Sequence, residues 1–476
     1  MRRPARLQRW LIAGGAAAVL GCAPTAGPVR PETGVGLPVD PTTVPESTVT
    51  PPPAASGVAD RREPPTRLPG NVDRDGARAI AAPITDIQRL SASARGREVR
   101  VLVATHRSDA DFAVSASWTV ERPGDAVAVA SGAAGRPWRI QRNGASLRVV
   151  RGDGAATPYR SGQLELRPAD RNAVVDVEGK RYRGSVVFHA TDAGILVVNH
   201  LPLEDYLAGV VPLEIGRERA TNELAAVEAQ AVAARSYTLT RLSRTGRYDL
   251  RATTADQVYG GVAAETPVAI RAVLNTRGLV LQHGGRTVNA PYHSTCGGTT
   301  AEAQEVWRTR GEPYLKRVDD RIPGSDRDYC AISPRYTWKK TIDAATLDAA
   351  VARHLGEYQR APAGGFGRVR DVRVQGTTAS GRAAEVTIAT GRGSYTLRGN
   401  DARYVLRRPG GEILNSSYFS VRGQAGDDGG VVLEGRGYGH GVGMCQWGAI
   451  GRARAGQDFR TILRTYFPGT TIGPAR

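Results

Sequence analysis

The stretch from Leu201 to Leu242 limits most strongly what this chain can fold into: LPLEDYLAGVVPLEIGRERATNELAAVEAQAVAARSYTLTRL. Its second half, residues 224–238, repeats apolar residues at helical spacing and is rich in alanine. This pattern predicts a helix against which another element can pack closely. Thr221 or Asn222 can cap the start of the helix, and Gly246 is expected to end it.

Glu214 is the candidate for chemistry in this stretch, because apolar residues flank it on both sides. A carboxyl group among apolar neighbours is poorly solvated, which raises its pKa. A raised pKa suits a general acid that works near neutral pH. Pro212 and Gly216 indicate a loop that leads into the following helix. The local sequence alone favours an ordinary loop glutamate, because glutamates beside apolar residues are common.

Several polar side chains in and after the predicted helix are candidates for a binding site. Gln230 and Arg235 lie within the helix, and buried polar groups there need hydrogen-bond partners. They could brace the carboxylate or only pin the helix, and their spacing fits both interpretations equally. The following loop, DLRATTADQVYGG, offers Asp256, Gln257 and Tyr259. These side chains could hold a sugar by hydrogen bonds and stacking, or they could belong to a packed loop.

A glycine-rich block near the C-terminus, GRGYGHGVGMCQWGAIGRARAG, is the last candidate for a site. Its glycines allow the backbone to approach a ligand closely. His440 and Gln446 are polar groups in this tight setting. His440 could orient the glutamate or bind a ligand, and a structural histidine is nearly as good an interpretation. A phosphate-binding loop is disfavoured, because no Lys-Ser/Thr pair follows the glycines.

Sequence blocks in a fixed order link these features: Asn199, Leu203–Leu207, Val210–Pro212 with Glu214, Ala229–Tyr237, Gln257–Gly261, His293–Gly298 and Gly439–Ala449. Together the blocks resemble the SpoIID/LytB family, which is named for stage II sporulation protein D and an amidase enhancer. The resemblance implies lytic cleavage of peptidoglycan glycan strands, with Glu214 as the catalytic acid/base.

The chain departs from the family pattern next to the glutamate. Ile215 stands where the family usually has Met, and Arg217-Glu218-Arg219 replaces the usual aromatic segment before the helix. Ala225 and Glu228 replace a common Glu and Lys. Since the glutamate itself is retained, these changes bear on substrate fit more than on chemistry.

The leading hypothesis is a lytic transglycosylase that acts on glycan strands without stem peptides. Protonated Glu214 would donate to the glycosidic oxygen between N-acetylmuramic acid and N-acetylglucosamine. It would then accept the proton of the C6 hydroxyl, which closes on C1 to give a 1,6-anhydro end. One carboxylate serves both steps, so no cofactor is required. Substrate binding is assigned to Arg235, Asp256, Gln257, Tyr259, His440 and Gln446.

Two rival functions stay open on sequence alone. Hydrolysis by a muramidase mechanism would need a second carboxylate and a water molecule, with Glu204, Asp205 or Asp256 as candidates. Alternatively, the chain could bind glycan and enhance a cell-wall amidase without catalysis. A formal net charge of +18 suits an acidic polymer such as peptidoglycan. Nucleic acid is disfavoured as a partner, because no nucleic-acid-binding motif is found.

The N-terminus has the pattern of an exported lipoprotein. Arginines precede an apolar run, Trp10–Leu20, that is too short for a stable membrane anchor. Gly21-Cys22 then resembles a lipoprotein cleavage box, which predicts a signal peptide over 1–22 and lipidation of Cys22. An ordinary secretory signal with an incidental cysteine is the alternative. The expected location is a membrane-anchored lipoprotein facing the periplasm or cell wall.

The rest of the chain predicts an α+β protein with several parts. Residues 23–95 are rich in Pro and Thr and read as a disordered linker. Residues 96–180 alternate apolar and polar residues between turn signals and predict a β-rich domain, with one of its strands over 113–120. A SpoIID-like catalytic domain is expected over 181–476, with an inserted subdomain around 335–400.

Besides Cys22, the chain has Cys296, Cys330 and Cys445. An odd number in an exported protein leaves one thiol over or indicates a role other than disulfide formation. A Cys296–Cys330 disulfide is the first expectation. A structural zinc ion bound by His293, Cys296 and Cys330 is the second, because zinc is associated with the family near the His-Ser-Thr segment. The fourth zinc ligand is not evident.

Overall fold

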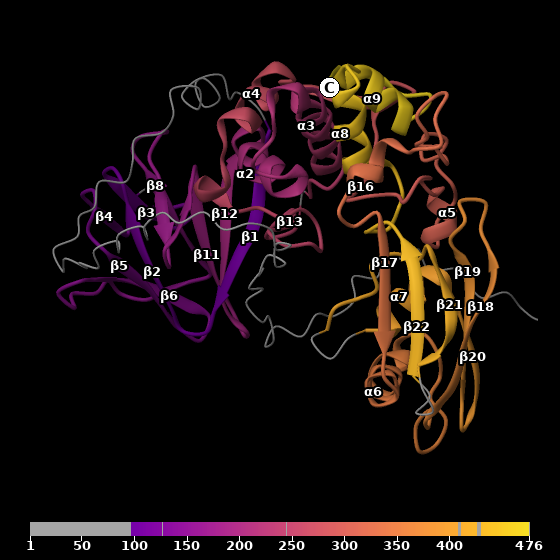
Figure 1. Cartoon of the computed structure of the whole chain (residues 1–476). Coiled ribbons are helices and arrows are strands. Elements are labelled where there is room, and N and C mark those ends of the chain that lie inside the picture. The colour runs from indigo at the N-terminus through magenta and orange to yellow at the C-terminus, as the bar shows by residue number, and fades with distance from the viewer. Residues whose placement is uncertain (1–96, 126, 244, 408–410, 426–429, 476) are drawn as a thin grey trace, which may run out of the picture. The chain divides into compact units, whose positions relative to one another are not determined.

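The computed structural model describes residues 97–475, except for residues 126, 244, 408–410 and 426–429. The expected signal segment with Cys22 and the expected linker over 23–95 lie outside the described residues. No helix formed by the described residues combines the length and apolarity needed to cross a bilayer. Helices and strands alternate little along the chain and form separate groups, so the predicted α+β class is confirmed (Figure 1).

The first part of the described chain is built from strands, as its alternating pattern predicts. The strands are β1 (Glu98–His106), β2 (Asp109–Val114), β3 (Trp118–Glu121), β4 (Ala130–Gly132), β5 (Trp138–Asn143), β6 (Ser146–Arg151), β7 (Arg160–Ser161), β8 (Gln163–Pro168), β9 (Val175–Val177), β10 (Lys180–Tyr182), β11 (Ser185–Thr191), β12 (Gly194–Pro202) and β13 (Leu250–Arg251). One sheet has the order β13-β1-β12-β11-β8-β3-β4, and the other has the order β10-β9-β2-β5-β6-β7.

The strand predicted over 113–120 is instead two strands in different sheets. Ser115 separates β2 from β3, and its backbone N–H and side-chain oxygen both bond to the backbone of Val174 at 3.0 and 2.8 Å. The chain therefore leaves one sheet and enters the other at this point. Phe112 and Trp118, one from each sheet, meet edge to face with ring centroids 5.1 Å apart, so the core lies between the sheets.

Three helices follow the sheets: α2 (Leu203–Ile215), α3 (Leu224–Leu239) and α4 (Pro267–Asn275). The expected side-chain caps of α3, Thr221 and Asn222, instead belong to a short 3-10 turn, in which the Glu223 carboxylate accepts from Ala220 N at 3.1 Å. The helix also ends well before Gly246. Beyond it the Asp249 carboxylate accepts the backbone N–H of Ser243 at 2.8 Å, which satisfies a donor outside the helical pattern.

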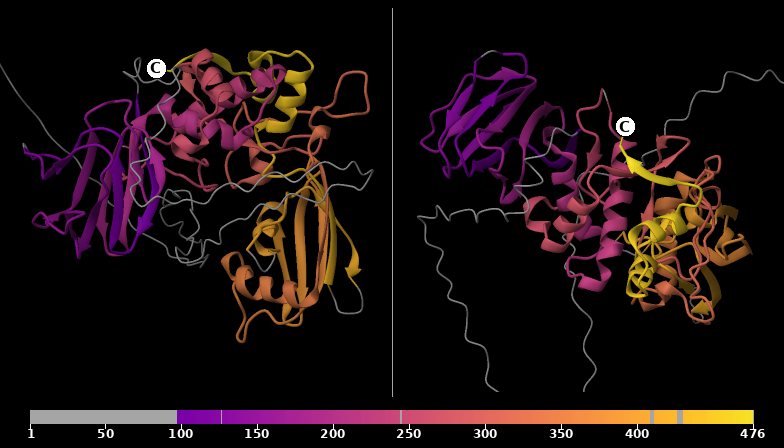
Figure 2. Two further views of the ribbon diagram at one scale, coloured as in Figure 1. Left: turned by 60° about the vertical axis from the view of Figure 1, so that its left-hand side comes forward. Right: turned by 90° about the horizontal axis from the view of Figure 1, so that it is seen from above.

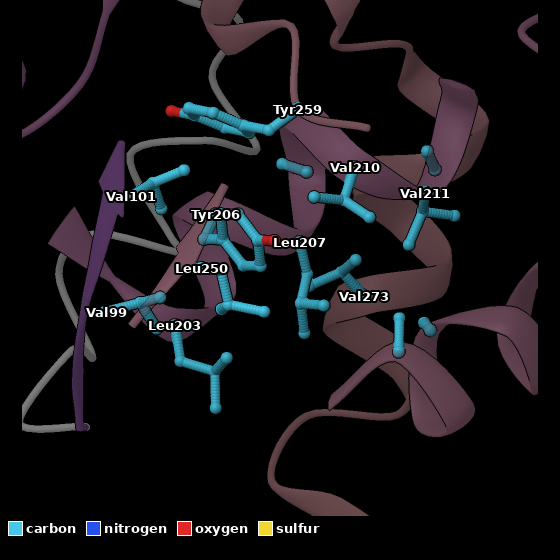
Figure 3. Packing of buried hydrophobic residues seen from close by; sticks show 14 of the residues in the cluster. Val99, Val101, Leu203, Tyr206, Leu207, Val210, Val211, Leu250, Tyr259 and Val273 are labelled. Carbon is cyan, nitrogen blue, oxygen red and sulfur yellow. The ribbon is translucent and has the colours of Figure 1, made fainter. Parts of the chain in front are cut away.

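The helices and the first strand share one hydrophobic core. Figure 3 shows side chains of α2 packed beside those of β1 and α4. The alanines predicted to allow close approach are buried on α3, where Ala226, Ala229 and Ala233 have no exposed surface. Side chains at this junction include Val99, Val101, Leu203, Tyr206, Leu207, Val210, Val211, Leu250, Tyr259 and Val273.

A second hydrophobic core belongs to the inserted subdomain, whose elements lie together in the views of Figures 1 and 2. Two sheets with the orders β17-β22-β21 and β18-β19-β20 form it with two helices. Residues that share this core run from Ile342 to Leu433, beyond the expected end near residue 400, because β22 returns to pair with β17. The elements are β17 (Thr337–Ile342), α6 (Ala344–His354), β18 (Val369–Thr377), β19 (Ala383–Thr390), β20 (Gly393–Arg398), α7 (Gly399–Val405), β21 (Phe419–Ala425) and β22 (Gly430–Arg436).

Short strands and two further helices complete the described chain. They are β14 (Leu279–His283), β15 (Arg286–Thr287), β16 (Tyr292–His293), α5 (Ala303–Val306), β23 (Met444–Cys445), α8 (Gln446–Arg454), α9 (Phe459–Tyr466) and β24 (Thr471–Pro474). Strand β16 pairs in parallel with β23, which brings the His-Ser-Thr segment beside the C-terminal glycine-rich block. Helices α8 and α9 follow that block directly.

Candidate active site

Glu214 lies in the last turn of α2, not in the loop that Pro212 and Gly216 predicted. Pro212 lies inside the helix, three residues before its end at Ile215. Gly216 has a φ of +105°, a conformation that suits glycine, and its N–H donates to Pro212 O at 3.1 Å. The helix therefore ends one residue after the glutamate, with Gly216 as its C-cap.

The Glu214 carboxyl is partly buried and held by two donors. Val258 N–H donates to its Oε1 at 2.9 Å, and the Gln446 amide donates to the same carboxylate. Burial raises the pKa of Glu214 to about 7, and these hydrogen bonds limit the rise. A carboxyl with this pKa is partly protonated near neutrality.

Tyrosines surround the carboxyl. Burial raises the pKa of Tyr206, Tyr237 and Tyr292, and the negative charge of Glu214 adds to the rise of each. Tyr237 and Tyr292 are half-buried residues, and their ring centroids lie 6.3 Å apart. The Arg241 guanidinium lies 3.6 Å from the Tyr237 ring centroid. Aromatic faces and a cation thus adjoin the acid.

The Gln446 side chain is hydrogen-bonded to Glu214 and is therefore not available to bind a ligand. Its side chain is buried, and its Nε2 also donates to Gln230 Oε1 at 3.3 Å. Gln230 thereby supports the residue that bonds the carboxylate. Among the described residues, Gln230 Nε2 is a buried donor without a hydrogen-bond partner.

Arg235 pins the helix and has no exposed surface with which to bind a substrate. Its guanidinium donates to both oxygens of Glu204, at 2.9 and 2.6 Å, and to Leu279 O at 3.0 Å. This pair joins α3 to the start of α2. It also removes Glu204 from the candidates for a second catalytic carboxylate.

Gln257 and Tyr259 are also structural, although the loop composition suggested contact with a sugar. Gln257 is fully buried and accepts from Tyr206 and Thr238, while its Nε2 donates to Tyr292 OH at 2.9 Å. The hydroxyl of Tyr259, a buried residue, donates to Asn199 Oδ1 at 2.9 Å. Both side chains hold the loop that delivers the Val258 N–H to Glu214.

Asp256 and His440, the remaining two predicted substrate-binding residues, differ from each other in what they contact. Asp256 is partly exposed, accepts from Arg251 N at 2.9 Å and acts electrostatically on Tyr206 and Tyr237, as Glu214 does. His440 Nδ1 accepts from the backbone N–H of Val442 at 3.1 Å, so its Nε2 donates to Tyr292 O at 2.9 Å. Asp256 thus lies near the acid, whereas His440 fixes the backbone of Tyr292.

Cys445 and the two cysteines considered as metal ligands lie together in the interior. Cys296, Cys330 and Cys445 are free, buried thiols in the structure, and the sulfurs of the first two are 3.4 Å apart without a bond between them. Asp320 joins them. His293 is not in that group; its Nδ1 bonds to Val442 O at 3.1 Å, and its ring lies 5.4 Å from that of His440.

Comparison with known proteins identifies the family. A family model described as Stage II sporulation protein (SpoIID) matches residues 191–283, which include Glu214 and all of α3. Stage II sporulation protein D of Bacillus subtilis is 30% identical over 295 residues, which cover 58% of this chain and 76% of that protein. The chain belongs to the SpoIID family.

Other relatives cover the chain to different extents. The Amidase enhancer of Bacillus subtilis is 30% identical over 342 residues, 65% of this chain, but the match spans only 46% of that relative. An uncharacterized protein of Brachyspira hyodysenteriae is 29% identical over 299 residues, with 62% and 73% of the two chains covered. A domain of unknown function (DUF8618) matches residues 326–443, which contain the inserted subdomain.

Sequence reasoning missed several members of this site. Tyr292 precedes the His-Ser-Thr block directly, and Tyr237 ends the helix block, so proximity to SpoIID motifs could have found both. The Val258 N–H could not be found, because any residue type supplies a backbone donor. Asp320 lies outside the SpoIID sequence blocks, so no motif in the sequence pointed to it.

Proposed function

We propose that this SpoIID protein is a peptidoglycan lytic transglycosylase with Glu214 as its single acid/base. The observation that carries the proposal is the pKa of Glu214, raised to about 7 by burial at the end of α2. A carboxyl that is partly protonated at neutral pH can donate to a leaving oxygen and afterwards take a proton back. The partly exposed Tyr237 and Tyr292 are suited to contact the sugar rings.

The reaction needs only this chain's residues. Glu214 donates its proton to the glycosidic oxygen as the bond from C1 of N-acetylmuramic acid to that oxygen breaks. The Glu214 carboxylate then takes the proton of the C6 hydroxyl, whose oxygen bonds to C1. The products are a 1,6-anhydro-muramoyl end and a free N-acetylglucosamine hydroxyl, and Glu214 is protonated again. Glycan without stem peptides is the expected substrate.

Hydrolysis by a muramidase mechanism would require another carboxylate to activate water. Glu204 is bonded to Arg235 and Asp205 is buried, so Asp256 is the remaining candidate of the original three. The mass of the released muramoyl ends separates the reactions, because an anhydro end lacks the water that hydrolysis adds.

A non-catalytic role is the second candidate function, and the name of the relative called Amidase enhancer favours it. In that role the chain would bind glycan strands and stimulate a cell-wall amidase. Both functions place the protein outside the cytoplasm at the cell wall. Lipidation of Cys22, with a signal peptide over 1–22, would attach it to a membrane there.

Replacement of the acid tests the proposal. Glu214→Gln keeps the shape of the side chain but cannot donate the required proton. The rate at which anhydro-ended fragments are released from denuded glycan should therefore fall about 10²–10⁴-fold. Glu218→Gln, at an exposed neighbouring position, is the matched control. Fragment release by Glu214→Gln at the wild-type rate would rule the mechanism out. If the wild type releases no fragments but it and Glu214→Gln stimulate an amidase equally, the enhancer function holds instead.

A further inference from the structure

An arginine lies beside the candidate active site and has no part in the proposed proton transfers. Arg241 follows the end of α3 at Leu239, and its guanidinium carbon lies 3.6 Å from the centre of the Tyr237 ring. Burial raises the pKa of Tyr237, the positive charge of Arg241 opposes that rise, and the negative charge of Glu214 adds to it. The cation and the acid therefore act on the same phenol.

The guanidinium of Arg241 is positioned by its neighbours but is bound loosely. Its Nη1 donates to Asn289 Oδ1 at 3.3 Å, and its Nε lies 4.0 Å from Asp256 Oδ1, beyond hydrogen-bond distance. The buried guanidinium of Arg235, by contrast, donates to both oxygens of Glu204 at 2.9 and 2.6 Å. The side chain of Arg241 is also 32% exposed. Because an arginine has five N–H donors, Arg241 keeps donors for a bound ligand.

The substrate of the proposed function carries an anion close to the bond that breaks. N-acetylmuramic acid bears a lactyl group on C3, separated by one ring carbon from the reacting C1. The lactyl group ends in a carboxylate when the stem peptide is absent and in a neutral amide when it is present. A planar guanidinium matches a carboxylate through two parallel hydrogen bonds, whereas an amide offers one uncharged oxygen. A cation beside the acid can therefore distinguish the two forms.

We infer that Arg241 binds the lactyl carboxylate of N-acetylmuramic acid and thereby selects glycan without stem peptides. The inference rests on the proposed function, because it takes a glycan strand as the ligand beside Glu214. Stacking on Tyr237 and the bond to Asn289 hold the guanidinium in place, which reduces the entropy lost when a ligand binds. Neither Arg241 nor Asn289 belongs to the SpoIID sequence blocks, so no motif assigns a role to them.

Binding to a catalytically inactive chain tests the inference without turnover. The full chain with Glu214→Gln is titrated calorimetrically with a stem-peptide-free tetrasaccharide of alternating N-acetylglucosamine and N-acetylmuramic acid. The same tetrasaccharide with its lactyl carboxylates converted to primary amides is the neutral comparison. Charge-assisted hydrogen bonds should make the carboxylate form bind about 10- to 100-fold more tightly. Equal Kd values for the two forms would overturn the inference.

Variants of Arg241 in the same Glu214→Gln chain assign the preference to this residue. Arg241→Gln should bind the carboxylate form as weakly as the amide form, and Arg241→Lys, which keeps the charge without the planar fork, should retain only part of the preference. Arg247→Gln, at an exposed position in the following loop, is the matched control and should retain all of it. Full preference in Arg241→Gln would overturn the assignment. The comparison of the two tetrasaccharides needs no Arg241 variant, so it can still overturn the inference if Arg241→Gln does not fold.

The outcomes separate this inference from the proposed function. Fragment release from denuded glycan by the wild type tests Glu214 and does not depend on the carboxylate preference. Fragment release together with equal affinity for the two tetrasaccharides would overturn the role of Arg241 and leave the acid/base assignment in place. A preference that Arg241→Gln loses, without fragment release by the wild type, would support Arg241 in a glycan-binding enhancer. If neither tetrasaccharide binds, the inference is overturned together with the glycan site.

Discussion

At the scale of single residues, the protonation of Glu214 links stability to function. Burial favours the neutral form, while the Val258 N–H and the Gln446 amide favour the charged form. Burial has the larger effect, so the pKa lies near 7. The same burial that keeps the acid partly protonated at neutral pH leaves the ionised carboxylate poorly solvated at higher pH. Ionisation of Glu214 therefore lowers the stability of the fold.

The raised pKa predicts how the stability of Glu214→Gln, relative to the wild type, depends on pH. The pKa of Glu214 rises from 4.5 to about 7 on folding, so the stabilisation is complete below pH 4.5 and is lost as the pH rises through 7. Glu214→Gln cannot ionise. Its free energy of unfolding should match the wild type near pH 4.5 and exceed it by up to about 3 kcal/mol at pH 8. Urea unfolding at both pH values measures this difference.

Glu218→Gln is the control for that comparison, since its side chain is exposed. It should follow the wild type at both pH values. A Glu214→Gln variant with the same stability difference at pH 4.5 and pH 8 would contradict a raised pKa, and the proposed acid would lose its physical basis.

At the scale of elements, a buried ion pair holds α2 against α3. Arg235 and Glu204 meet through two hydrogen bonds, and Leu279 O binds the same guanidinium. The loop that carries Gln257 is bonded to this unit through Tyr206 and Thr238. Glu214 stands at the end of α2, so the position of the acid depends on these contacts.

Removal of one partner of this pair should be more harmful than removal of both. Arg235→Met leaves the Glu204 charge buried and unpaired, which typically costs about 3–5 kcal/mol. The double variant Arg235→Met, Glu204→Leu should recover much of that loss, because no charge then stays in the core. Denaturant unfolding of both variants measures the difference.

Activity of the same variants tests whether Arg235 also binds substrate. The folded double variant should keep its KM for denuded glycan within about twofold, since Arg235 has no exposed surface. A large rise in KM without loss of stability would return Arg235 to the substrate-binding residues.

At the scale of the whole molecule, the inserted subdomain has a core of its own. Ile388 and Leu433 are fully buried within it, and the described hydrophobic clusters keep it distinct from the core around α2 and α3. Hydrogen bonds nevertheless reach outside it: Arg382 donates to Cys296 O at 3.2 Å and to Thr299 O at 3.0 Å. The subdomain is thus a separate hydrophobic unit that is joined to the SpoIID core by polar contacts.

Ile388→Ala should loosen that unit alone. Deleting a fully buried side chain of this size costs about 2–5 kcal/mol, and the loss should fall on the cooperative unit that contains it. Hydrogen exchange followed by mass spectrometry should show faster exchange in β17–β22 and unchanged protection in α2 and α3. Equal loss of protection in both regions would mean that the described chain unfolds as one unit.

The sequence by itself predicted the α+β class, the alanine-rich helix and the candidate acid. Helical spacing set α3 close to its predicted range over 224–238, because this signal acts between neighbouring residues. Alternation identified most of the early strands for the same reason. Glu214 was singled out by the family motif, since its local sequence alone favoured an ordinary loop glutamate, and in the structure burial raises its pKa to about 7.

Only the tertiary structure decided what the other polar residues do. Gln446 and Gln230 are 216 positions apart, and Cys296 and Cys445 are 149 apart, yet each pair is in contact. A polar side chain looks the same in the sequence whether it faces a ligand or satisfies a buried partner. Its role is fixed by burial and by the partner that folding brings to it, as the pairing of Arg235 with Glu204 and of Tyr259 with Asn199 illustrates.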